Sequence, residues 1–318
     1  MADLAGVPLE HPLMNAAGTC KTVDDVARLA RSAVAAVVVG SITAEPRAGN
    51  SGDVYWAGPG WSLNSLGLPN RGAGDLRREL PRMVELTRAA GKPLVVSVAG
   101  FSVDEYARLA DAAAGADLVE LNLGCPNVWD GGEQKRIACF DPDQTERVCR
   151  ATHEALAPSG TPFGVKVSPF SDPAALAALG DRLVGLSSDL DTFRFVTAVN
   201  TFPNGFQLDA AGRPVVDVGF AGVSGAALKP IGLGQVRQLR ALLPPTVDVV
   251  GVGGVANGSD VHDYLAVGAV AVQSATAFWN AGEDPRAYGE ILAGYVDLLD
   301  PADTANAADT ALTADGGA

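Results

Sequence analysis

Short apolar runs, most of them rich in β-branched residues, recur along the chain and alternate with stretches in which apolar residues return every three or four positions. The runs are mostly continuous rather than alternating, which is typical of parallel strands covered by helices. Eight runs occur, the number of strands in a (β/α)8 barrel. They cover residues 12–18, 35–40, 93–100, 117–124, 163–170, 195–202, 247–254 and 269–277.

The stretches between these runs carry helix signals as well as the helical period. Asp172 precedes Pro173, which places an N-cap residue before a proline at the first helical position. We therefore predict an α/β fold, a single TIM barrel over residues 1–300 whose last helix spans roughly 286–299. The small polar residues 301–318 predict a disordered tail.

Two connections are longer than a barrel requires. Residues 41–74 and 203–229 are both rich in glycine and proline. Active sites of such barrels lie above the carboxyl ends of the strands. We therefore expect both segments to be functional loops on that face, since long connections in compact domains are often functional.

The charge balance narrows the classes of partner. Lysine and arginine number 23 against 37 aspartate and glutamate, a formal net charge of −14, which disfavours nucleic acid and anionic membranes as partners. No signal peptide or membrane-spanning run is evident, so we expect a cytoplasmic protein. The four cysteines and three scattered histidines indicate neither a disulfide scaffold nor a metal site.

The polar residues at the predicted strand ends are mainly amides and small hydroxyl residues. Asn and Gln side chains match the donor and acceptor pattern of neutral heterocycles, whereas a metal site would need clustered carboxylates or imidazoles. The candidates are Asn15, Gly18, Ser41, Ser97, Asn122, Cys125, Asn127, Lys166, Ser168, Asn200, Thr201, Gly253, Gly254, Ala275 and Thr276.

Glycine-rich turns follow the last two strands, with a third in the preceding long loop around Gly225. Gly253 and Gly254 follow the seventh strand, and Ala275 and Thr276 follow the eighth. Barrels often bind phosphate at this place, near the N-terminus of a short helix. Together these turns predict a phosphate site.

Cys125 lies in LNLGCPN, directly after the fourth strand, where Pro126 ends the strand and presents the thiol on a loop at the barrel mouth. The alternative is a buried structural cysteine, which is the commoner fate of this residue type. The neighbouring amides Asn122 and Asn127 favour a functional role. Cys139, on the same loop, is interpreted as structural.

Lys166 interrupts an apolar strand, where a lysine needs a partner or a function. One interpretation is a salt bridge within the barrel. The other is a cation beside a developing anion, such as the N1–C2=O edge of a reduced flavin.

In order and spacing, eight motifs resemble the FMN-dependent dihydroorotate dehydrogenases, in particular the class 1 enzymes, with the dihydropyrimidine dehydrogenase domain as a near relative. The motifs are NAAG (15–18), SLNSLGLPN (62–70), ELNLGCPN (120–127), GVKVSP (164–169), VNT (199–201), SGAALKP (224–230), GVGGVANG (251–258) and QSATA (273–277). The membrane-associated class of this family carries serine where Cys125 stands.

The resemblance implies that Cys125 removes a proton from dihydroorotate while FMN accepts a hydride. It implies a homodimer and, in some forms, a separate electron-transfer subunit, and it leaves fumarate, NAD and quinone open as acceptors. The implied substrate-binding residues are Asn64, Ser65, Leu66, Gly67, Leu68, Asn122, Asn127, Asn200 and Thr201. The implied FMN-binding residues are Ala17, Gly18, Ser41, Asn122, Lys166, Val199, Gly225, Gly253, Gly254, Ala275 and Thr276.

Gly40 departs from the family pattern, which has a lysine that reaches FMN and substrate at this position. Either another cation compensates, with Arg47 and Arg71 as candidates, or the substrate is another cyclic amide or dihydropyrimidine. A third hypothesis is a non-redox phosphate-binding barrel such as an isomerase or aldolase, which leaves Cys125 and the site asparagines unexplained.

Overall fold

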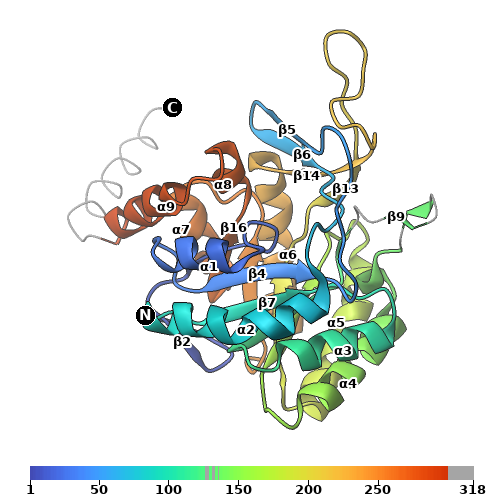
Figure 1. Cartoon of the computed structure of the whole chain (residues 1–318), viewed down its shortest axis with the longest axis vertical. Coiled ribbons are helices and arrows are strands. Elements are labelled where there is room, and N and C mark those ends of the chain that lie inside the picture. The colour runs from blue at the N-terminus through green and yellow to red at the C-terminus, as the bar shows by residue number, and fades with distance from the viewer. Residues whose placement is uncertain (126–128, 131–132, 135, 300–318) are drawn as a thin grey trace, which may run out of the picture.

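Eight parallel strands form one sheet, with helices on its outer face (Figure 1). The computed structural model describes residues 1–125, 129–130, 133–134 and 136–299. The strands are β3 (Leu13–Asn15), β4 (Val37–Ile42), β7 (Leu94–Val98), β8 (Leu118–Asn122), β11 (Phe163–Val167), β12 (Phe193–Ala198), β15 (Asp248–Val252) and β16 (Ala271–Ser274). Each overlaps its predicted run, so the predicted α/β barrel is confirmed; the predicted tail, 301–318, lies outside the described residues.

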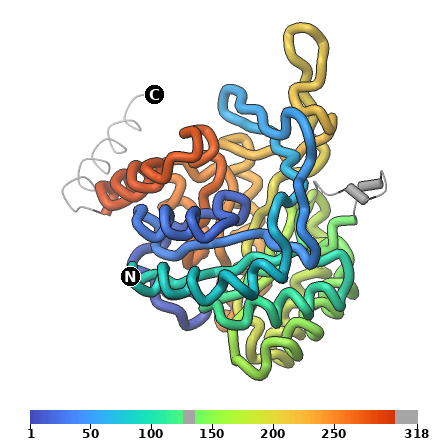
Figure 2. Tube along the Cα trace, in the orientation of Figure 1, coloured from blue at the N-terminus to red at the C-terminus, as the bar shows by residue number. Residues whose placement is uncertain are grey.

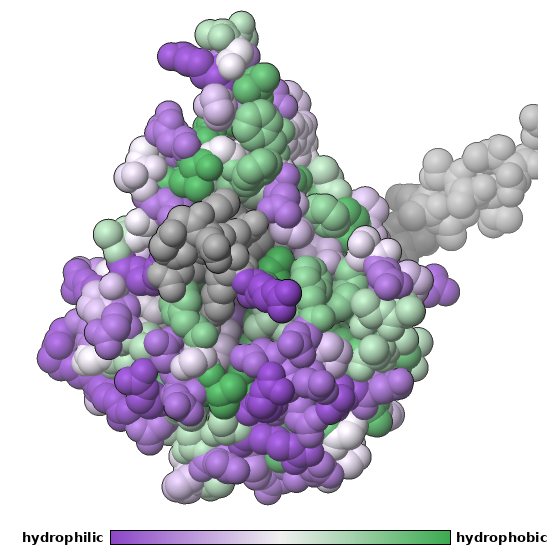
Figure 3. Space-filling model, turned by 90° about the vertical axis from the view of Figure 1, so that its right-hand side faces the viewer, coloured by the Kyte–Doolittle hydropathy of each residue, from purple (hydrophilic) through white to green (hydrophobic). Residues whose placement is uncertain are grey.

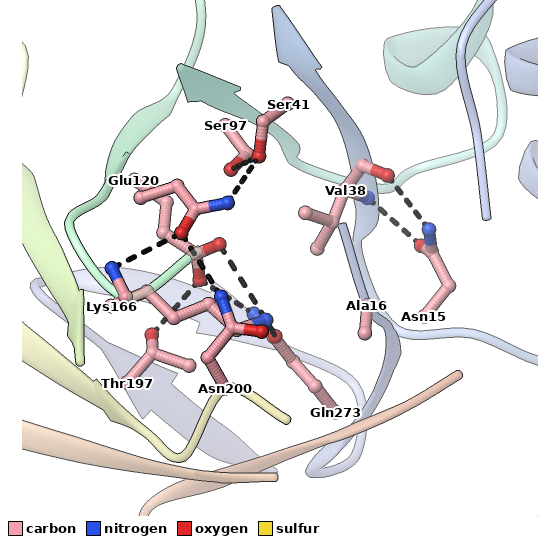
Figure 4. A network of polar contacts seen from close by, with 12 residues as sticks. Asn15, Ala16, Val38, Ser41, Ser97, Glu120, Lys166, Thr197, Asn200 and Gln273 are labelled. Carbon is pink, nitrogen blue, oxygen red and sulfur yellow. Dashed lines mark hydrogen bonds and ion pairs between the residues drawn. The ribbon is translucent and has the colours of Figure 1, made fainter. Parts of the chain in front are cut away.

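The sheet follows the order β3-β16-β15-β12-β11-β8-β7-β4, so its two ends are β3 and β4. The side chain of Asn15 joins these ends. Its Nδ2 donates to the Val38 carbonyl at 2.7 Å, and its Oδ1 accepts from the Val38 amide at 2.8 Å. One carboxamide thus takes the place of a backbone peptide at the seam of the barrel (Figure 4).

Helices follow the strands and cover the barrel. Asp172 caps α5 through its side chain, with Pro173 at the first helical position as predicted. Among the described residues, none of the helices combines the length and apolarity needed to cross a bilayer. The α-helices are α1 (Val23–Ala30), α2 (Gly72–Ala89), α3 (Val103–Ala113), α4 (Pro142–Leu156), α5 (Pro173–Asp189), α6 (Lys229–Leu242), α7 (Gly258–Ala266), α8 (Thr276–Asn280) and α9 (Arg286–Asp297). Two 3-10 turns are η1 (Ala138–Phe140) and η2 (Ala226–Leu228).

A hairpin precedes the barrel and supplies part of its inner core. β1 (Ala2–Leu4) pairs with β2 (Val7–Leu9), and the buried side chains of Leu4 and Leu9 pack with Met14, Val38 and Phe195. The larger core lies between the strands and the surrounding helices. The site described below is at the opposite end of the strands from this hairpin.

The two long connections are more ordered than the predicted loops. They form an antiparallel sheet in the order β13-β14-β6-β5, comprising β13 (Phe202–Gly205), β14 (Ala221–Ser224), β6 (Trp61–Asn64) and β5 (Tyr55–Gly58). A separate two-stranded sheet pairs β9 (Trp129–Asp130) with β10 (Glu133–Gln134). These strands were missed because each has at most four residues, and glycine or proline occurs in three of the four strands of the larger sheet.

The additional sheet projects beyond the barrel, and its two segments lie side by side although about 160 residues separate the paired positions (Figure 2). Leu63, Val216 and Ala221 form its small core. Apolar residues mix with hydrophilic ones on the projection, whereas the lower part of that face is mainly hydrophilic (Figure 3). Phe206 and Phe220 are half exposed there, with ring centroids 5.9 Å apart.

Candidate active site

A cavity opens at the carboxyl ends of the first strands, and we call it the Cys125 cavity. It contains most of the predicted substrate-side residues, which come from loops far apart in the sequence. Ala17, Gly18, Lys21, Gly40, Ser41, Asn64, Leu66, Gly67, Leu68, Pro69, Asn122, Cys125, Lys166 and Asn200 line it.

A second cavity lies beside the first and is lined by the predicted phosphate-binding residues; we call it the Gly253 cavity. Ala17, Lys166 and Asn200 line both cavities, so the two meet at these residues. The other lining residues are Ala16, Val199, Thr201, Ser224, Leu228, Val252, Gly253, Gly254, Val255, Gln273, Ser274, Ala275 and Thr276. The two cavities are therefore adjacent.

The wall of the Gly253 cavity requires glycine. Gly254 has φ +70°, and a Cβ atom there would lie 2.7 Å from Lys229 Cβ and 2.8 Å from the Gly225 carbonyl oxygen. The short helix α8 begins at Thr276, beside this wall, and the first amides of a helix have no partner within it. Exposed backbone amides of this kind suit an anion such as phosphate.

Amide side chains at the junction are held in fixed orientations. Asn122 Nδ2 donates to Ser41 Oγ at 2.9 Å, and Asn122 Oδ1 accepts from Asn200 Nδ2 at 3.0 Å. The Asn200 Oδ1 in turn accepts from the Thr201 amide at 2.8 Å. Tyr106 supports the end of β8 by donating its hydroxyl to the Asn122 carbonyl at 2.8 Å. This network fixes the donor and acceptor positions before any ligand binds (Figure 4).

Lys166 forms the ion pair of the first interpretation, and its place beside a flavin stays a prediction. It lines both cavities, and it is almost fully buried. Its Nζ donates to Gln273 Oε1 at 2.8 Å and lies 3.9 Å from Glu120 Oε1. Burial lowers the pKa of Lys166, while the charges of Glu120 and Cys125 act in the opposite direction.

The two cysteines of the β8 loop have different surroundings. Cys125 is partly exposed and lines its cavity. Cys139 is fully buried, and its Sγ accepts from the Ser168 amide at 3.3 Å. Burial raises the pKa of Cys139 to about 12, so it stays a thiol at neutral pH. This environment agrees with the structural role predicted for Cys139.

The backbone at Gly40 has no room for the lysine found there in the family pattern. Gly40 has φ +111°, and a Cβ atom would lie 2.2 Å from the Ser97 carbonyl oxygen. Neither Arg47 nor Arg71 lines the Cys125 cavity. Arg47 instead donates through Nε to the Gly67 carbonyl, and its guanidinium lies 5.1 Å from the Phe101 ring centroid.

Lys21 is the cation that the sequence analysis missed. It lines the Cys125 cavity together with Gly40, and its Nζ is 5.8 Å from the ring centroid of Trp279. Burial lowers the pKa of Lys21, against the opposing charges of Glu283 and Asp25. The signal was its place three residues after Gly18, in the same loop above the first strand.

Three predicted residues differ from the rest in their placement. Ser65 is fully buried and accepts from Asn50 Nδ2 at 3.1 Å, so its hydroxyl is held beneath the loop rather than at the cavity. Gly225 stands behind Gly254 and does not line the Gly253 cavity itself. Asn127 lies outside the described residues.

Comparisons with known proteins agree with this geometry. The family model for dihydroorotate dehydrogenase matches residues 1–294. Dihydroorotate dehydrogenase (fumarate) of Trypanosoma brucei brucei is 32% identical over 289 residues, covering 88% of each chain. Dihydroorotate dehydrogenase A (fumarate) of Lacticaseibacillus paracasei is 33% identical over 299 residues, 92% of this chain and 96% of the relative.

Other relatives extend the comparison. The catalytic subunit of dihydroorotate dehydrogenase B (NAD(+)) of Methanopyrus kandleri is 35% identical over 247 residues, 76% of this chain and 74% of the relative. The ligand-free crystal structure of DHODH from Eimeria tenella superposes with a TM-score of 0.78 at 20% identity, over 94% of this chain and 87% of that one. At that identity the superposition supports the fold alone.

Proposed function

The chain belongs to the dihydroorotate dehydrogenase family, and from this we propose that it oxidises dihydroorotate to orotate in pyrimidine biosynthesis, with FMN as the bound cofactor. The observation that carries the proposal is the pair of cavities that meet at Ala17, Lys166 and Asn200. The Cys125 cavity contains a thiol and oriented asparagine side chains. The Gly253 cavity contains backbone amides of glycine residues beside the first residue of α8. Family membership also argues against the isomerase and aldolase alternative.

The residues of the Gly253 cavity fit FMN. Its phosphate would be held by the backbone at Gly253, Gly254 and Thr276, where the glycine wall leaves space for an anion. Lys166, at the junction, would face the pyrimidine edge of the flavin ring. When bound, FMN supplies the two-electron acceptor of the reaction. The other proposed FMN residues are Ala17, Gly18, Ser41, Asn122, Val199, Gly225 and Ala275.

The Cys125 cavity supplies the groups that would bind and orient the substrate. The ring amides of dihydroorotate need donors and acceptors, which Asn64, Asn122 and Asn200 provide. The segment Leu66–Leu68 would cover the ring. The proposed set also includes Thr201, which lines the Gly253 cavity beside Asn200, and Asn127, which lies outside the described residues. We assign Lys21 to the substrate carboxylate because it brings a positive charge to the cavity where Gly40 brings none.

Cys125 would act as the base. Its thiolate would take the proton from C5 of the substrate, the hydride would leave C6, and the C5–C6 double bond would form between them. The Lys166 ammonium interacts electrostatically with Cys125 and thus favours a negatively charged sulfur. The fixed amides of Asn122 and Asn200 would hold the ring in the orientation that both transfers require.

The second candidate is a related FMN oxidoreductase acting on another cyclic amide or dihydropyrimidine, which Gly40 favours. Lys21 weakens that case, because it offers the cation that a carboxylate substrate needs. The decisive difference between the two candidates is therefore the charge of the substrate.

Two measurements test the proposed function. Mass spectrometry of the cofactor released from purified protein should find FMN; finding FAD or no flavin would refute the cofactor assignment. Anaerobic dihydroorotate should then bleach the flavin absorption, and the uncharged dihydrouracil serves as the matched control. Bleaching by dihydrouracil alone would establish the second candidate. Fumarate, NAD and a quinone, offered separately to the reduced protein, distinguish the three possible acceptors.

A further inference from the structure

Glu120 is a buried carboxylate beneath the junction of the two cavities, and no role was assigned to it above. It is fully buried on β8, with its side chain inside the barrel network (Figure 4). Its Oε2 accepts from Thr197 Oγ1 and from Gln273 Nε2, both at 2.9 Å. Its Oε1 accepts no hydrogen bond from the described residues and lies 3.9 Å from Lys166 Nζ.

The carboxylate determines the orientation of Gln273. An ionised carboxylate can only accept, so Gln273 must turn its amide nitrogen toward Glu120. Its oxygen then faces Lys166, whose Nζ donates to it at 2.8 Å. Glu120 thus controls the aim of Lys166 through one intervening amide.

The carboxylate also balances the charge of Lys166. An isolated buried ammonium is costly, and burial alone would favour the neutral amine. Among the described residues, the titratable groups that face Lys166 are Glu120 on β8 and Cys125 on the following loop, and Lys21 lines the same cavity. The neighbouring strands contribute Thr197 on β12 and Gln273 on β16, which do not titrate.

We propose that Glu120 is a positioning residue which, partly through Gln273, keeps Lys166 charged and directed at the junction of the cavities, and so raises the reduction potential of the bound flavin. The proposal rests on the proposed FMN site. Because a charged Lys166 stabilises the anionic reduced flavin, losing that charge makes the flavin harder to reduce.

The test is the midpoint potential of the bound flavin as a function of pH. In Glu120→Gln the shape of the side chain is kept but Lys166 has no counter-charge, so burial lowers the pKa of Lys166 without the opposing charge of Glu120. The plot should bend at the pH where Lys166 loses its proton, and above the bend the potential should fall below that of the parent protein. The parent should show no bend at that pH.

Two control variants separate charge from structure. Glu120→Asp keeps the charge, so its plot should lack the bend. Thr197→Val removes one hydrogen bond to the same carboxylate without changing its charge, and it should also follow the parent. A straight plot for Glu120→Gln, or an equal bend for Thr197→Val, would overturn the proposal.

A stability cycle covers the case in which Glu120→Gln does not fold. Lys166→Met leaves a buried carboxylate alone, and the double variant removes both charges, so the double variant should be more stable than the sum of the single changes predicts. If Glu120→Gln is unfolded, folding of the double variant supports the proposal and failure to fold overturns it. The stability cycle can be measured on protein without flavin. If the purified protein contains no FMN, the proposed function is refuted, but the coupling between Glu120 and Lys166 can still be measured.

Discussion

Replacement of Lys21 by methionine tests the assignment of the substrate carboxylate. Methionine keeps much of the length of the side chain and removes the charge. Loss of a hydrogen bond to a charged group costs about 1.5–3 kcal/mol, which corresponds to roughly 10- to 150-fold weaker binding. Lys21 lines the Cys125 cavity and not the Gly253 cavity, so the variant should retain its FMN.

The assay is titration of the oxidised protein with orotate, followed through the flavin absorption spectrum. Arg71→Met is the matched control, because Arg71 is an exposed cation that lies outside the lining of the cavity. We expect that variant to bind orotate within about twofold of the parent. A neutral ligand such as uracil should bind the Lys21 variant and the parent alike.

The affinity for orotate should change with pH in one direction. Lys21 is positively charged below its pKa, and burial lowers that pKa, so orotate should bind more weakly as the pH rises through it. The Lys21→Met variant should lack this dependence. Unchanged orotate affinity in Lys21→Met would refute the reasoning and leave the carboxylate without its proposed partner.

Four further substitutions test the site and the fold. Cys125→Ala should keep FMN but slow flavin reduction by dihydroorotate by about 10²–10⁴-fold, whereas Cys139→Ala should change that rate by less than about threefold, as stopped-flow measurements will show. Lys166→Ala should slow the same step, and unaltered reduction kinetics would remove its role beside the flavin. Asn15→Ala leaves the buried amide and carbonyl of Val38 without partners, so urea unfolding should show a loss of about 2–6 kcal/mol, and a loss below about 0.5 kcal/mol would contradict the closing role of Asn15.

The barrel was predictable because its strands are buried on both faces. Runs such as 35–40 and 247–254 contain little but apolar and glycine residues, and their number and spacing leave few alternative folds. The candidate site was predicted by the same logic, because the carboxyl ends of parallel strands meet at one face. Cys125, Asn122 and Lys166 were predicted for this reason, and they do line one cavity.

Other features depend on contacts that no local pattern records. The projecting sheet pairs Leu63 with Val223, residues whose short strands are individually too weak a signal. From the sequence alone, Lys21 resembles a surface lysine that precedes a helix. The structure places it at the Cys125 cavity together with Gly40. Glu120 is the first residue of the motif ELNLGCPN and lies in an apolar strand. An acidic residue in a buried strand needs a partner or a function, as Lys166 does, so the sequence did contain a signal for Glu120.

The pairing of β6 with β14 connects the walls of the two cavities. Asn64, at the end of β6, stands opposite Gly222, and β14 runs on from Ser224 into the turn behind Gly254. A ligand that shifts one of these segments acts on the other through their paired strands. The affinities of the proposed cofactor and substrate should therefore be coupled, and the effect of each on the affinity of the other must be equal.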